Sequence, residues 1–459
     1  MKPADLAGAR VLVAGAGVSG LAAAGALVEL GALVTVTDAV PARLSDLPSG
    51  AEPGADPDGV PPGTALVVTS PGRRPDHPLV AAAAAAGAPL VGEPELAWWI
   101  GQARDTPPVW LAITGTNGKT TTTGMLAAIL RAAGRDAMAC GNIGYPVVDA
   151  VRAGHDVLAV ELSSFQLHWS PSIRPYAGCV LNVADDHLDW HGSFDAYAAA
   201  KARVLRADVA VAGVDDPAAA ALLAAAPAPR RVGVTLGEPG PGQLGVVGGT
   251  LVDRAFGGGD LVEAAAVHPG GPPGITDALA AAALARAHGA GPDAVREGLD
   301  DFRPGPHRGG EVGAVAGVRY LDDSKATNPH AAEASIMARA PAPVVWIAGG
   351  LLKGASVDDL VARHGRGLRA AVVIGAERSE IVAALARHAP EVPVAEVGAG
   401  DDGAMTGVMT TAVRRAAAFA QPGDVVLLAP AAASMDQFAD YADRGRAFAA
   451  AVAALDGAS

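Results

Sequence analysis

The sequence predicts an α/β protein built of three domains, and three observations lead to that prediction. Short runs of Val, Ile and Leu alternate with longer alanine-rich stretches, which is typical of parallel strands covered by helices. The chain has 459 residues, enough for three domains of ordinary size. Two polar, proline-bearing segments, 102–108 and 302–310, interrupt the pattern and are expected to be linkers. The expected domains are therefore 1–106, 107–304 and 305–459.

Composition and charge exclude several classes of protein. Acidic residues outnumber basic ones, 48 to 34, and the net charge is −14, whereas nucleic-acid binding needs a basic face. Two cysteines, Cys140 and Cys179, are too few for a disulfide framework or a four-cysteine zinc site. The most apolar stretch, 79–91, is mostly alanine and too short to span a membrane, and no secretory signal is recognisable. We expect a cytoplasmic monomer with no nucleic-acid or membrane partner.

The strands are expected at the apolar runs, in chain order. The first domain should contain strands at 10–14, 33–37, 65–69 and 89–92. The second should contain strands at 109–114, 157–160 and 178–181, a small antiparallel meander within the glycine-rich segment 232–266, and a helix at 277–288. The third should contain strands at 318–321, 344–348, 370–374 and 425–428. Each domain thus alternates strands with helices, and the first and third are expected to be Rossmann-like.

A glycine-rich turn connects the first strand to the first helix. Its glycines, Gly15, Gly17 and Gly20, allow a tight turn and the close approach of a diphosphate to the start of a helix. Asp38 ends the next strand, where an acid can bind ribose hydroxyls. Alone, this pattern indicates a nicotinamide-dependent dehydrogenase, although such a turn can also serve only the packing of strand and helix. It indicates a diphosphate ligand more firmly than it indicates NAD.

A second turn, 115–120 (GTNGKT), lies between the strand 109–114 and a helix. It predicts a phosphate-binding loop in which backbone amides hold the phosphates, Lys119 supplies charge and the Thr120 hydroxyl can bind Mg²⁺. The strict spacing would place glycine at position 113, where this chain has Ile113, so the loop is a compact variant. A dehydrogenase explains only the first turn, and a motor or transporter only the second. An ATP-driven ligase acting on a nucleotide-linked substrate explains both.

Polar residues follow the next two strands. Glu161 ends the strand after the loop, where a Mg²⁺ ligand would lie, although a solvated acid is an equally good reading of such a position. His187 belongs to the polar segment 182–189, and spacing alone does not make a single histidine a metal ligand. Lys201, in a helical stretch, would by default be a surface lysine.

Several segments resemble, in order, the Mur ligases, ATP-dependent amide ligases related to folylpolyglutamate and cyanophycin synthetases. They are GTNGKTT (115–121), ELSSFQ (161–166), NVADDHLD (182–189) and the following Lys201. In the last third, DDSKATN (322–328) and the segments 306–308, 349–353 and 428–438 are similar to the branch of the family that adds D-glutamate to UDP-N-acetylmuramoyl-L-alanine. Ser70-Pro71-Gly72 and the motif 141–144 fit that branch as well, so the resemblance covers essentially the whole chain.

The resemblance implies an ATP-dependent ligase of peptidoglycan precursor synthesis that forms an acyl phosphate, with ATP, UDP-N-acetylmuramoyl-L-alanine and D-glutamate as substrates. It implies a first domain that binds the UDP substrate through Val18, Ser19, Asp38, Ser70 and Asn142. It implies ATP contacts from Gly115, Thr116, Asn117, Gly118, Lys119, Thr120, Thr121, Arg308 and Asp323. It implies Mg²⁺ ligands at Thr120, Glu161, His187 and a carbamylated Lys201, and D-glutamate contacts from Thr327, Lys353, Ser434 and Tyr441. Lys119, His187, Lys201 and Lys325 are the implied catalytic residues.

The chain departs from the family pattern at a few positions. Pro273, Gly274 and Asp277 stand where the family has a His-Asn pair and a further Asn, which leaves the adenine contacts open. Ala39-Val40 follows Asp38 where relatives carry polar or basic residues, so uracil contacts are expected to be fewer. Three alternatives stay open: a folylpolyglutamate-type ligase, a nicotinamide-dependent oxidoreductase and a regulatory nucleotide-binding protein without turnover. The DDSKATN segment argues against a folylpolyglutamate-type ligase, and the phosphate loop argues against an oxidoreductase. The Mg²⁺ ligands argue against a protein without turnover.

Overall fold

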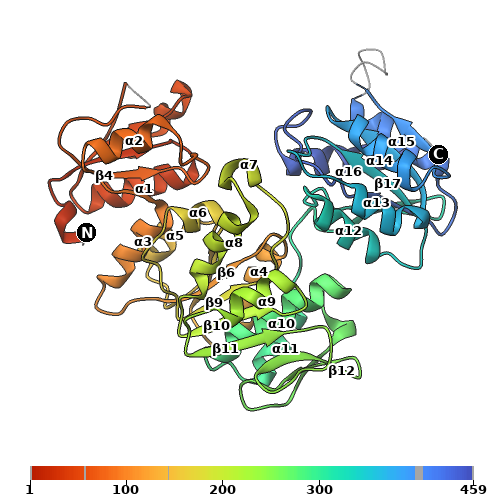
Figure 1. Ribbon diagram of the computed structural model, residues 1–459, viewed down its shortest axis with the longest axis horizontal. Helices are drawn as coiled ribbons and strands as arrows, with labels where there is room; N and C mark the ends of the chain where they lie inside the picture. Colours follow the sequence, from red (N-terminus) through yellow and green to blue (C-terminus); the bar gives the residue numbers. More distant parts are fainter. Residues whose placement is uncertain (1–2, 56–57, 143, 399–406, 457–459) are drawn as a thin grey trace. The chain divides into compact units, whose positions relative to one another are not determined.

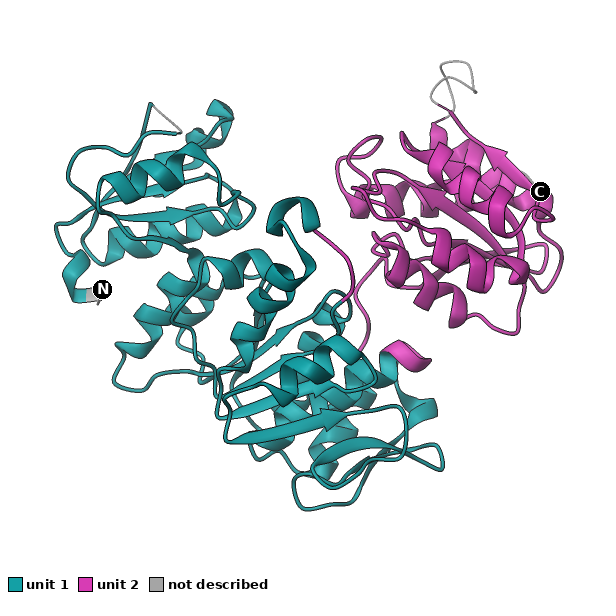
Figure 2. Ribbon diagram, in the orientation of Figure 1, with its two compact units in different colours: residues 1–183, 188–268, 274–302 teal, residues 184–187, 269–273, 303–459 magenta. Residues whose placement is uncertain are grey.

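The computed structural model describes the chain except for residues 1–2, 56–57, 143, 399–406 and 457–459, so Ile143 of the motif 141–144 lies outside the described residues. The described chain is of the expected α/β class, with three sheets. It divides into two compact units (Figure 2). Unit 1 comprises residues 1–183, 188–268 and 274–302, and unit 2 comprises residues 184–187, 269–273 and 303–459. Unit 1 therefore contains the first expected domain and most of the second, whose residues 184–187, 269–273 and 303–304 belong to unit 2.

The first sheet of unit 1 is parallel throughout, with the order β3-β2-β1-β4-β5. It belongs to the red to orange part of the chain in Figure 1, where β4 is labelled. Its strands are β1 (Arg10–Ala14), β2 (Leu33–Thr37), β3 (Ala51–Pro53), β4 (Thr64–Thr69) and β5 (Leu90–Gly92). Helices α1 (Val18–Glu29), α2 (Pro78–Ala85) and α3 (Glu93–Gln102) accompany them. Successive residues of β1 face opposite sides: Val11 and Val13 pack in one apolar cluster with α1, and Leu12 and Ala14 pack in another with α2.

The second sheet of unit 1 has nine strands in the order β14-β13-β12-β11-β10-β9-β6-β8-β7. They are β6 (Val109–Thr114), β7 (Ala137–Gly141), β8 (Val157–Glu161), β9 (Ala177–Val180), β10 (Val209–Gly213), β11 (Arg230–Val234), β12 (Gln243–Val247), β13 (Thr250–Asp253) and β14 (Asp260–Glu263). The accompanying helices are α4 (Lys119–Ala132), α5 (Val147–Ala153), α6 (Ser164–His168), α7 (Leu188–His191), α8 (Phe194–Ala202), α9 (Pro217–Ala224), α10 (Pro272–Ala287) and α11 (Pro292–Asp301).

The antiparallel meander expected within 232–266 is present, formed by β12, β13 and β14. Strand β13 pairs antiparallel with both β12 and β14, while β11 pairs in parallel with both β10 and β12. The meander is therefore an extension of the large sheet. Helix α10 begins at Pro272, five residues before the expected start, because prolines are tolerated in the first turn of a helix. In unit 1 the expected strands omitted β3, β7 and β10. The alternating alanines of β7 and β10 favour helix when considered locally.

The third sheet lies in unit 2, in the order β15-β16-β20-β17-β18-β19, and is parallel except for β15. Its strands are β15 (Gly310–Val315), β16 (Val318–Asp322), β17 (Val344–Gly349), β18 (Leu368–Ile374), β19 (Val394–Glu396) and β20 (Val425–Leu428). Helices α12 (Pro329–Met337), α13 (Asp358–His364), α14 (Arg378–His388), α15 (Val408–Phe419) and α16 (Tyr441–Asp456) surround it. Among the described residues, no helix is both long and apolar enough to cross a membrane.

One buried acid lies where the first sheet of unit 1 meets the second. Glu93, the first residue of α3, is 2% exposed, and its Oε1 accepts a hydrogen bond of 2.6 Å from the backbone N–H of Val148 in α5. Burial raises the pKa of the Glu93 carboxyl to about 7, although hydrogen bonds from the backbone oppose the shift. The native chain therefore holds a proton on Glu93 at pH values where the unfolded chain has lost it.

Because this pKa is raised in the native state, Glu93 makes stability fall as pH rises from about 4.5 to about 7, and no further change follows above that range. Glu93→Gln mimics the protonated form and does not titrate. We expect the variant to gain stability over the parent across that window, up to the order of 3 kcal/mol at pH 8. Thermal unfolding at pH 5 and pH 8 measures this, with the exposed Glu52→Gln as control. An equal difference at both pH values would contradict the assignment.

Candidate active site

The loop 115–118 joins β6 to α4. Strand β6 lies between the parallel strands β8 and β9, so the loop begins at the edge of the sheet where these strands end. In the sheet, Ile113 of β6 is opposite Glu161 of β8, and Thr114 is opposite Val180 of β9. Gly118 has a left-handed backbone (φ 85°), and a Cβ at this position would lie 2.2 Å from Oδ1 of Asp277. Only glycine fits here without displacing the Asp277 carboxylate. That carboxylate, 7% exposed, also accepts a hydrogen bond of 3.1 Å from Thr122 of α4.

Side chains from outside the loop fix its backbone. The N–H of Asn117 donates to Oδ1 of Asn182 at 2.9 Å, and Nδ2 of Asn182 returns a bond of 3.3 Å to the carbonyl of Asn117. The Thr116 hydroxyl lies 3.1 Å from the hydroxyl of Tyr197, which is buried in α8. Asn182 follows β9, so the loop is fixed by the strand beside it and by the helix that covers it.

Two lysine ammonium groups converge on one carbonyl of this loop. Lys119 donates to the carbonyl oxygens of Gly115 and Thr116, each at 2.9 Å. Lys201 donates to the same oxygen of Gly115 at 2.7 Å, and its Nζ lies 4.4 Å from the centre of the Tyr197 ring. Lys201 is 1% exposed, so it is not the surface lysine that its sequence position suggests by default. The result is a concentration of positive charge beside the loop, which suits a polyphosphate.

Oxygen ligands for a divalent cation lie at the same edge of the sheet. Glu161 ends β8, is 1% exposed, and accepts a bond of 2.9 Å from Nδ2 of Asn142. Thr120 lies in the first turn of α4. Within the described ranges, no group of three or more His, Cys, Asp or Glu could hold a metal ion by itself. A cation here would need further oxygens, such as those of a nucleotide. His187 belongs to the segment 184–187 of unit 2, has a left-handed backbone (φ 54°) and lies 3.5 Å from the Asp186 carboxylate.

The glycine turn after β1 is also held by an acid and a hydroxyl. Asp38 accepts hydrogen bonds of 2.8 Å from the backbone N–H groups of Ala16 and Val40. Burial raises the pKa of its carboxyl, but these two bonds and nearby Arg43 outweigh burial and lower it. Ser70 donates to the carbonyl of Ala14 at 3.1 Å, and a Cβ at Gly15 would lie 1.9 Å from its hydroxyl.

Helix α1 begins beside this turn. Its N-cap is Gly17, which supplies no side-chain cap, so the first turn of the helix presents its N–H groups. Val18 is 70% exposed, and Ser19 is partly exposed. The structure therefore brings Val18 and Ser19 to the same turn as Ser70 and Asp38. Asn142 follows β7 of the second sheet and donates to Glu161.

In unit 2, the expected D-glutamate residues follow three strands that are neighbours in one sheet, β16, β20 and β17. Thr327 follows β16, Lys353 follows β17 and Ser434 follows β20. Leu351 and Ala433 exchange two backbone hydrogen bonds of 2.9 Å, which hold the loops of Lys353 and Ser434 together. Lys353 is exposed and has a left-handed backbone (φ 55°), a conformation that is costly for lysine and that occurs often at functional sites.

The DDSKATN segment lies beside the start of α16. Lys325 Nζ is 4.0 Å from the centre of the Tyr441 ring, and Asp322 accepts a hydrogen bond of 2.6 Å from Nδ1 of His307. Burial raises the pKa of the Asp323 carboxyl to about 6, against the effect of Arg339 and Arg308. Asp323 and Arg308 thus interact within unit 2.

Sequence analysis missed two residues that organise these sites, Tyr197 and Arg444. Arg444 in α16 is 1% exposed and donates to the carbonyls of Ser324 (2.8 Å) and Ala432 (3.1 Å), so it joins the DDSKATN segment to the loop after β20. Burial lowers the pKa of its guanidinium to about 10. Nothing local in the sequence distinguishes this buried arginine from the exposed Arg446 two residues later.

Known families match most of the chain. The Mur ligase middle domain matches residues 113–241, the Mur ligase glutamate ligase domain matches 307–432, and the C-terminal domain of alanine dehydrogenase/PNT matches 4–53. The last match covers the first glycine turn, the part of the chain that resembles dehydrogenases.

Similar proteins agree with the family models. UDP-N-acetylmuramoylalanine–D-glutamate ligases of Nocardia farcinica and Rhodococcus jostii are 55% and 53% identical, and the alignments cover 98% of this chain and 98% and 96% of theirs. The chain belongs to the UDP-N-acetylmuramoylalanine–D-glutamate ligases. It is therefore a ligase of the Mur family, as the sequence motifs indicate.

Solved structures share the fold of this ligase at low identity. UDP-N-acetylmuramate-alanine ligase from Thermotoga maritima has a TM-score of 0.60 at 18% identity, and covers 98% of this chain and 100% of that one. The MurF ligase of the same organism, in complex with ADP, has a TM-score of 0.58 at 16% identity, with coverages of 99% and 97%.

The contact between Gly118 and Asp277 predicts a specific sensitivity of the ligase. Gly118→Ala places a Cβ against the carboxylate as well as in a left-handed conformation, so we expect a lower unfolding temperature and loss of ATP binding. Gly134→Ala is the matched control, because Gly134 is also left-handed (φ 71°) but has open space around its Cβ position. Unfolding temperature and ATP titration should separate the two variants. Equal effects would mean that the Asp277 contact is unimportant.

Proposed function

We propose that the chain joins D-glutamate to UDP-N-acetylmuramoyl-L-alanine in the cytoplasm, where ATP is converted to ADP and phosphate. The support that carries this proposal is the combination of the phosphate loop with the first glycine turn in a chain 55% identical to a ligase of that name. A carboxylate and an amine do not condense in water at a useful rate, so the carboxylate must be activated. Phosphorylation by ATP gives an acyl phosphate, and attack by the glutamate amine then releases phosphate.

Residues around the phosphate loop fit the first step. In the proposal, the amides of 115–118, Thr121 and the Lys119 ammonium bind the triphosphate, which reduces the repulsion between the substrate carboxylate and the γ-phosphate. Arg308 and Asp323 are assigned to ATP, Lys325 and His187 to the reacting groups, and Asn142 to the muramoyl substrate. Val18, Ser19, Asp38 and Ser70 are assigned to the UDP group.

The residues present fit Mg²⁺ because they offer oxygen ligands, a buried carboxylate at Glu161 and a hydroxyl at Thr120. When bound, the ion supplies charge neutralisation on the phosphate oxygens. The protein's own part is to hold Glu161 in position, through the hydrogen bond from Asn142.

We also propose that Lys201 is carbamylated in the active enzyme. Its neutral amine would add carbon dioxide and lose a proton, which forms a carbamate anion whose oxygens suit Mg²⁺. The environment supports this assignment, because Lys201 is buried and shares the Gly115 carbonyl with Lys119. Converting one of two neighbouring cations into an anion removes their mutual repulsion.

Lys201→Ala should be nearly inactive, and acetate should restore part of the activity because it can place a carboxylate in the vacated space. Phosphate release with and without acetate measures this, with chloride at equal ionic strength as the control. Full activity of the variant, or a free amine at Lys201 in the active parent, would rule out the carbamate.

The D-glutamate site is proposed at the ends of β16, β20 and β17, with Thr327, Ser434, Lys353 and Tyr441 around the amino acid. D-Glutamate has two carboxylates, so its site should combine a cation with hydroxyl or backbone donors. Lys353 and Ser434 follow neighbouring strands whose loops are hydrogen-bonded to each other, and the carboxyl ends of such strands bind ligands in open α/β sheets.

Phosphate release with UDP-N-acetylmuramoyl-L-alanine and a panel of amino acids tests the function. D-Glutamate should support turnover, whereas L-glutamate, D-aspartate and L-alanine should not. In the same assay, Lys353→Ala should raise the KM for D-glutamate about ten- to hundredfold, with little change in the KM for ATP. Arg363→Ala, which removes an exposed cation paired with Glu333, is the control. A glutamate KM within about twofold of the parent would remove Lys353 from the site.

Three further expectations remain proposals: a monomeric enzyme, domain boundaries near residues 106 and 304, and Rossmann-like first and third domains. The parallel sheets of β1–β5 and β16–β20 support the last of these.

A further inference from the structure

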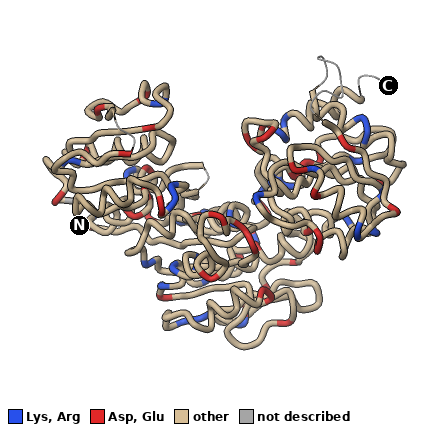
Figure 3. The backbone as a smooth tube through the Cα atoms, turned by 45° about the horizontal axis from the view of Figure 1, so that its top comes forward, with Lys and Arg blue, Asp and Glu red and all other residues tan. Residues whose placement is uncertain are grey.

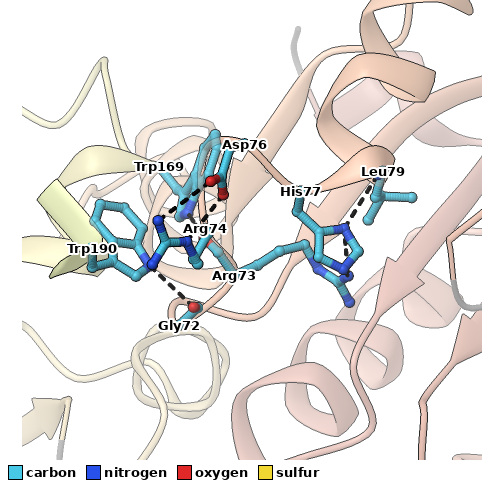
Figure 4. A network of polar contacts seen from close by, with 8 residues as sticks. All are labelled: Gly72, Arg73, Arg74, Asp76, His77, Leu79, Trp169 and Trp190. Atoms are coloured by element: carbon cyan, nitrogen blue, oxygen red, sulfur yellow. Dashed lines mark hydrogen bonds and ion pairs between the residues drawn. The ribbon is translucent and has the colours of Figure 1, made fainter. Parts of the chain in front are cut away.

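A loop follows β4 and carries two adjacent arginines, Arg73 and Arg74 (Figure 4). Two tryptophans hold its backbone: Trp190 donates to the carbonyl of Gly72 at 3.0 Å, and Trp169 donates to the carbonyl of Arg73 at 3.3 Å. Both tryptophans are 8% exposed and pack edge to face with each other. The backbone from which the two arginine side chains project is therefore fixed.

The Arg73 guanidinium is half-buried against His77, which offers it no good acceptor. Nη1 lies 2.9 Å from Nε2 and 3.1 Å from Nδ1 of the ring. Nδ1 already accepts from the backbone N–H of Leu79 at 3.2 Å, and Nε2 faces the Asp58 carboxylate at 3.5 Å. In the neutral ring this arrangement places the proton on Nε2, so neither nitrogen has a free lone pair for Arg73.

The same guanidinium has unused hydrogen-bonding capacity. Its Nε is buried and has no hydrogen-bond partner among the described residues. Burial lowers the pKa of Arg73, and the carboxylates of Asp58 and Asp38 oppose that shift from a distance. In the part of the chain that the structure describes, no carboxylate comes within ion-pair distance of Arg73, whereas Arg74 forms an ion pair of 3.0 Å with Asp76. A partly desolvated cation without a carboxylate partner favours an anionic ligand.

The position of Arg73 indicates which anion it would bind. It lies three residues after Ser70, whose hydroxyl contacts Ala14 at the glycine turn, and the charge of Asp38 reaches it. Strands β1 and β4 are parallel neighbours, so the turn and the arginine loop lie at the same edge of the sheet. Helix α1, with its uncapped first turn, begins at that edge.

We propose that Arg73 binds the diphosphate of the UDP substrate through its guanidinium. The proposal rests on the function proposed above and adds a substrate-binding residue to it. Arginine suits this task because its planar group can donate two parallel hydrogen bonds to phosphate oxygens. It supplies a cation to an edge where Ala39 and Val40, which follow Asp38, supply none.

Binding of UDP to the full chain, measured by calorimetry, tests the proposal without any need for turnover. Arg73→Gln should weaken UDP binding about ten- to hundredfold, while binding of uridine, followed by ligand-observed NMR, should not change. Arg73→Lys keeps the charge but loses the planar donor pair, so its affinity for UDP should be intermediate. Arg74→Gln is the matched control, and we expect it to bind UDP as the parent does.

Turnover gives an independent readout. Arg73→Gln should raise the KM for the UDP substrate, with little change in kcat or in the KM for ATP. UDP affinity within about twofold of the parent, or an equal loss for UDP and uridine, would overturn the proposal. If Arg73→Gln does not fold, Arg73→Lys decides: weaker UDP binding at an unchanged unfolding temperature supports the proposal, and unchanged binding overturns it. If Arg73→Gln weakens UDP binding as expected but the parent does not turn over D-glutamate, the proposed function is refuted and the role of Arg73 is not.

Discussion

The carbonyl oxygen of Gly115 is the point on which the candidate ATP site depends. Lys119 and Lys201 both donate to it, from two different helices. Bringing two ammonium groups to one acceptor is unfavourable by itself, since like charges repel and Lys201 has little contact with water. A polyphosphate, or the proposed carbamate on Lys201, would bring negative charge to this point and offset that repulsion.

The loop can hold the lysines only because its backbone has very little freedom. Gly118 is left-handed and lies against the buried Asp277 carboxylate, while Asn182 binds both the N–H and the carbonyl of Asn117. Asp277 also binds Thr122 in the first turn of α4, so one carboxylate limits both the loop and the helix. Asp277, one of the positions where the sequence differs from the motifs it resembles, therefore contacts the phosphate loop.

Local patterns in the sequence predicted the parts of the molecule that local sequence determines. Glycines between a strand and a helix specify a turn by themselves, so both turns were placed correctly at Gly15 and Gly115. The partners that hold those turns could not be predicted in the same way. Asp277 lies 155 positions from Thr122, and Arg444 lies 120 positions from Ser324. Such pairs depend on how strands are ordered in a sheet, and no periodicity in the sequence carries that information.

A different signal in the sequence, the scarcity of lysine, coincides with the candidate site residues. The chain has five lysines, and four of them, Lys119, Lys201, Lys325 and Lys353, are candidate site residues; Lys2 lies outside the described residues. The other residues counted as Lys or Arg are all arginines, and several of them form ion pairs with exposed acids. Basic residues occur along both units (Figure 3). Arginine replaces lysine readily where only charge and solubility are required. It does not replace lysine where a compact ammonium must fit beneath a loop or where an amine must react with carbon dioxide. In a chain that uses arginine almost everywhere else, four of the five lysines fall at positions where we propose that the amine itself is needed. Arg73 is the complementary case, a position where the planar group suits the anion better than an amine would.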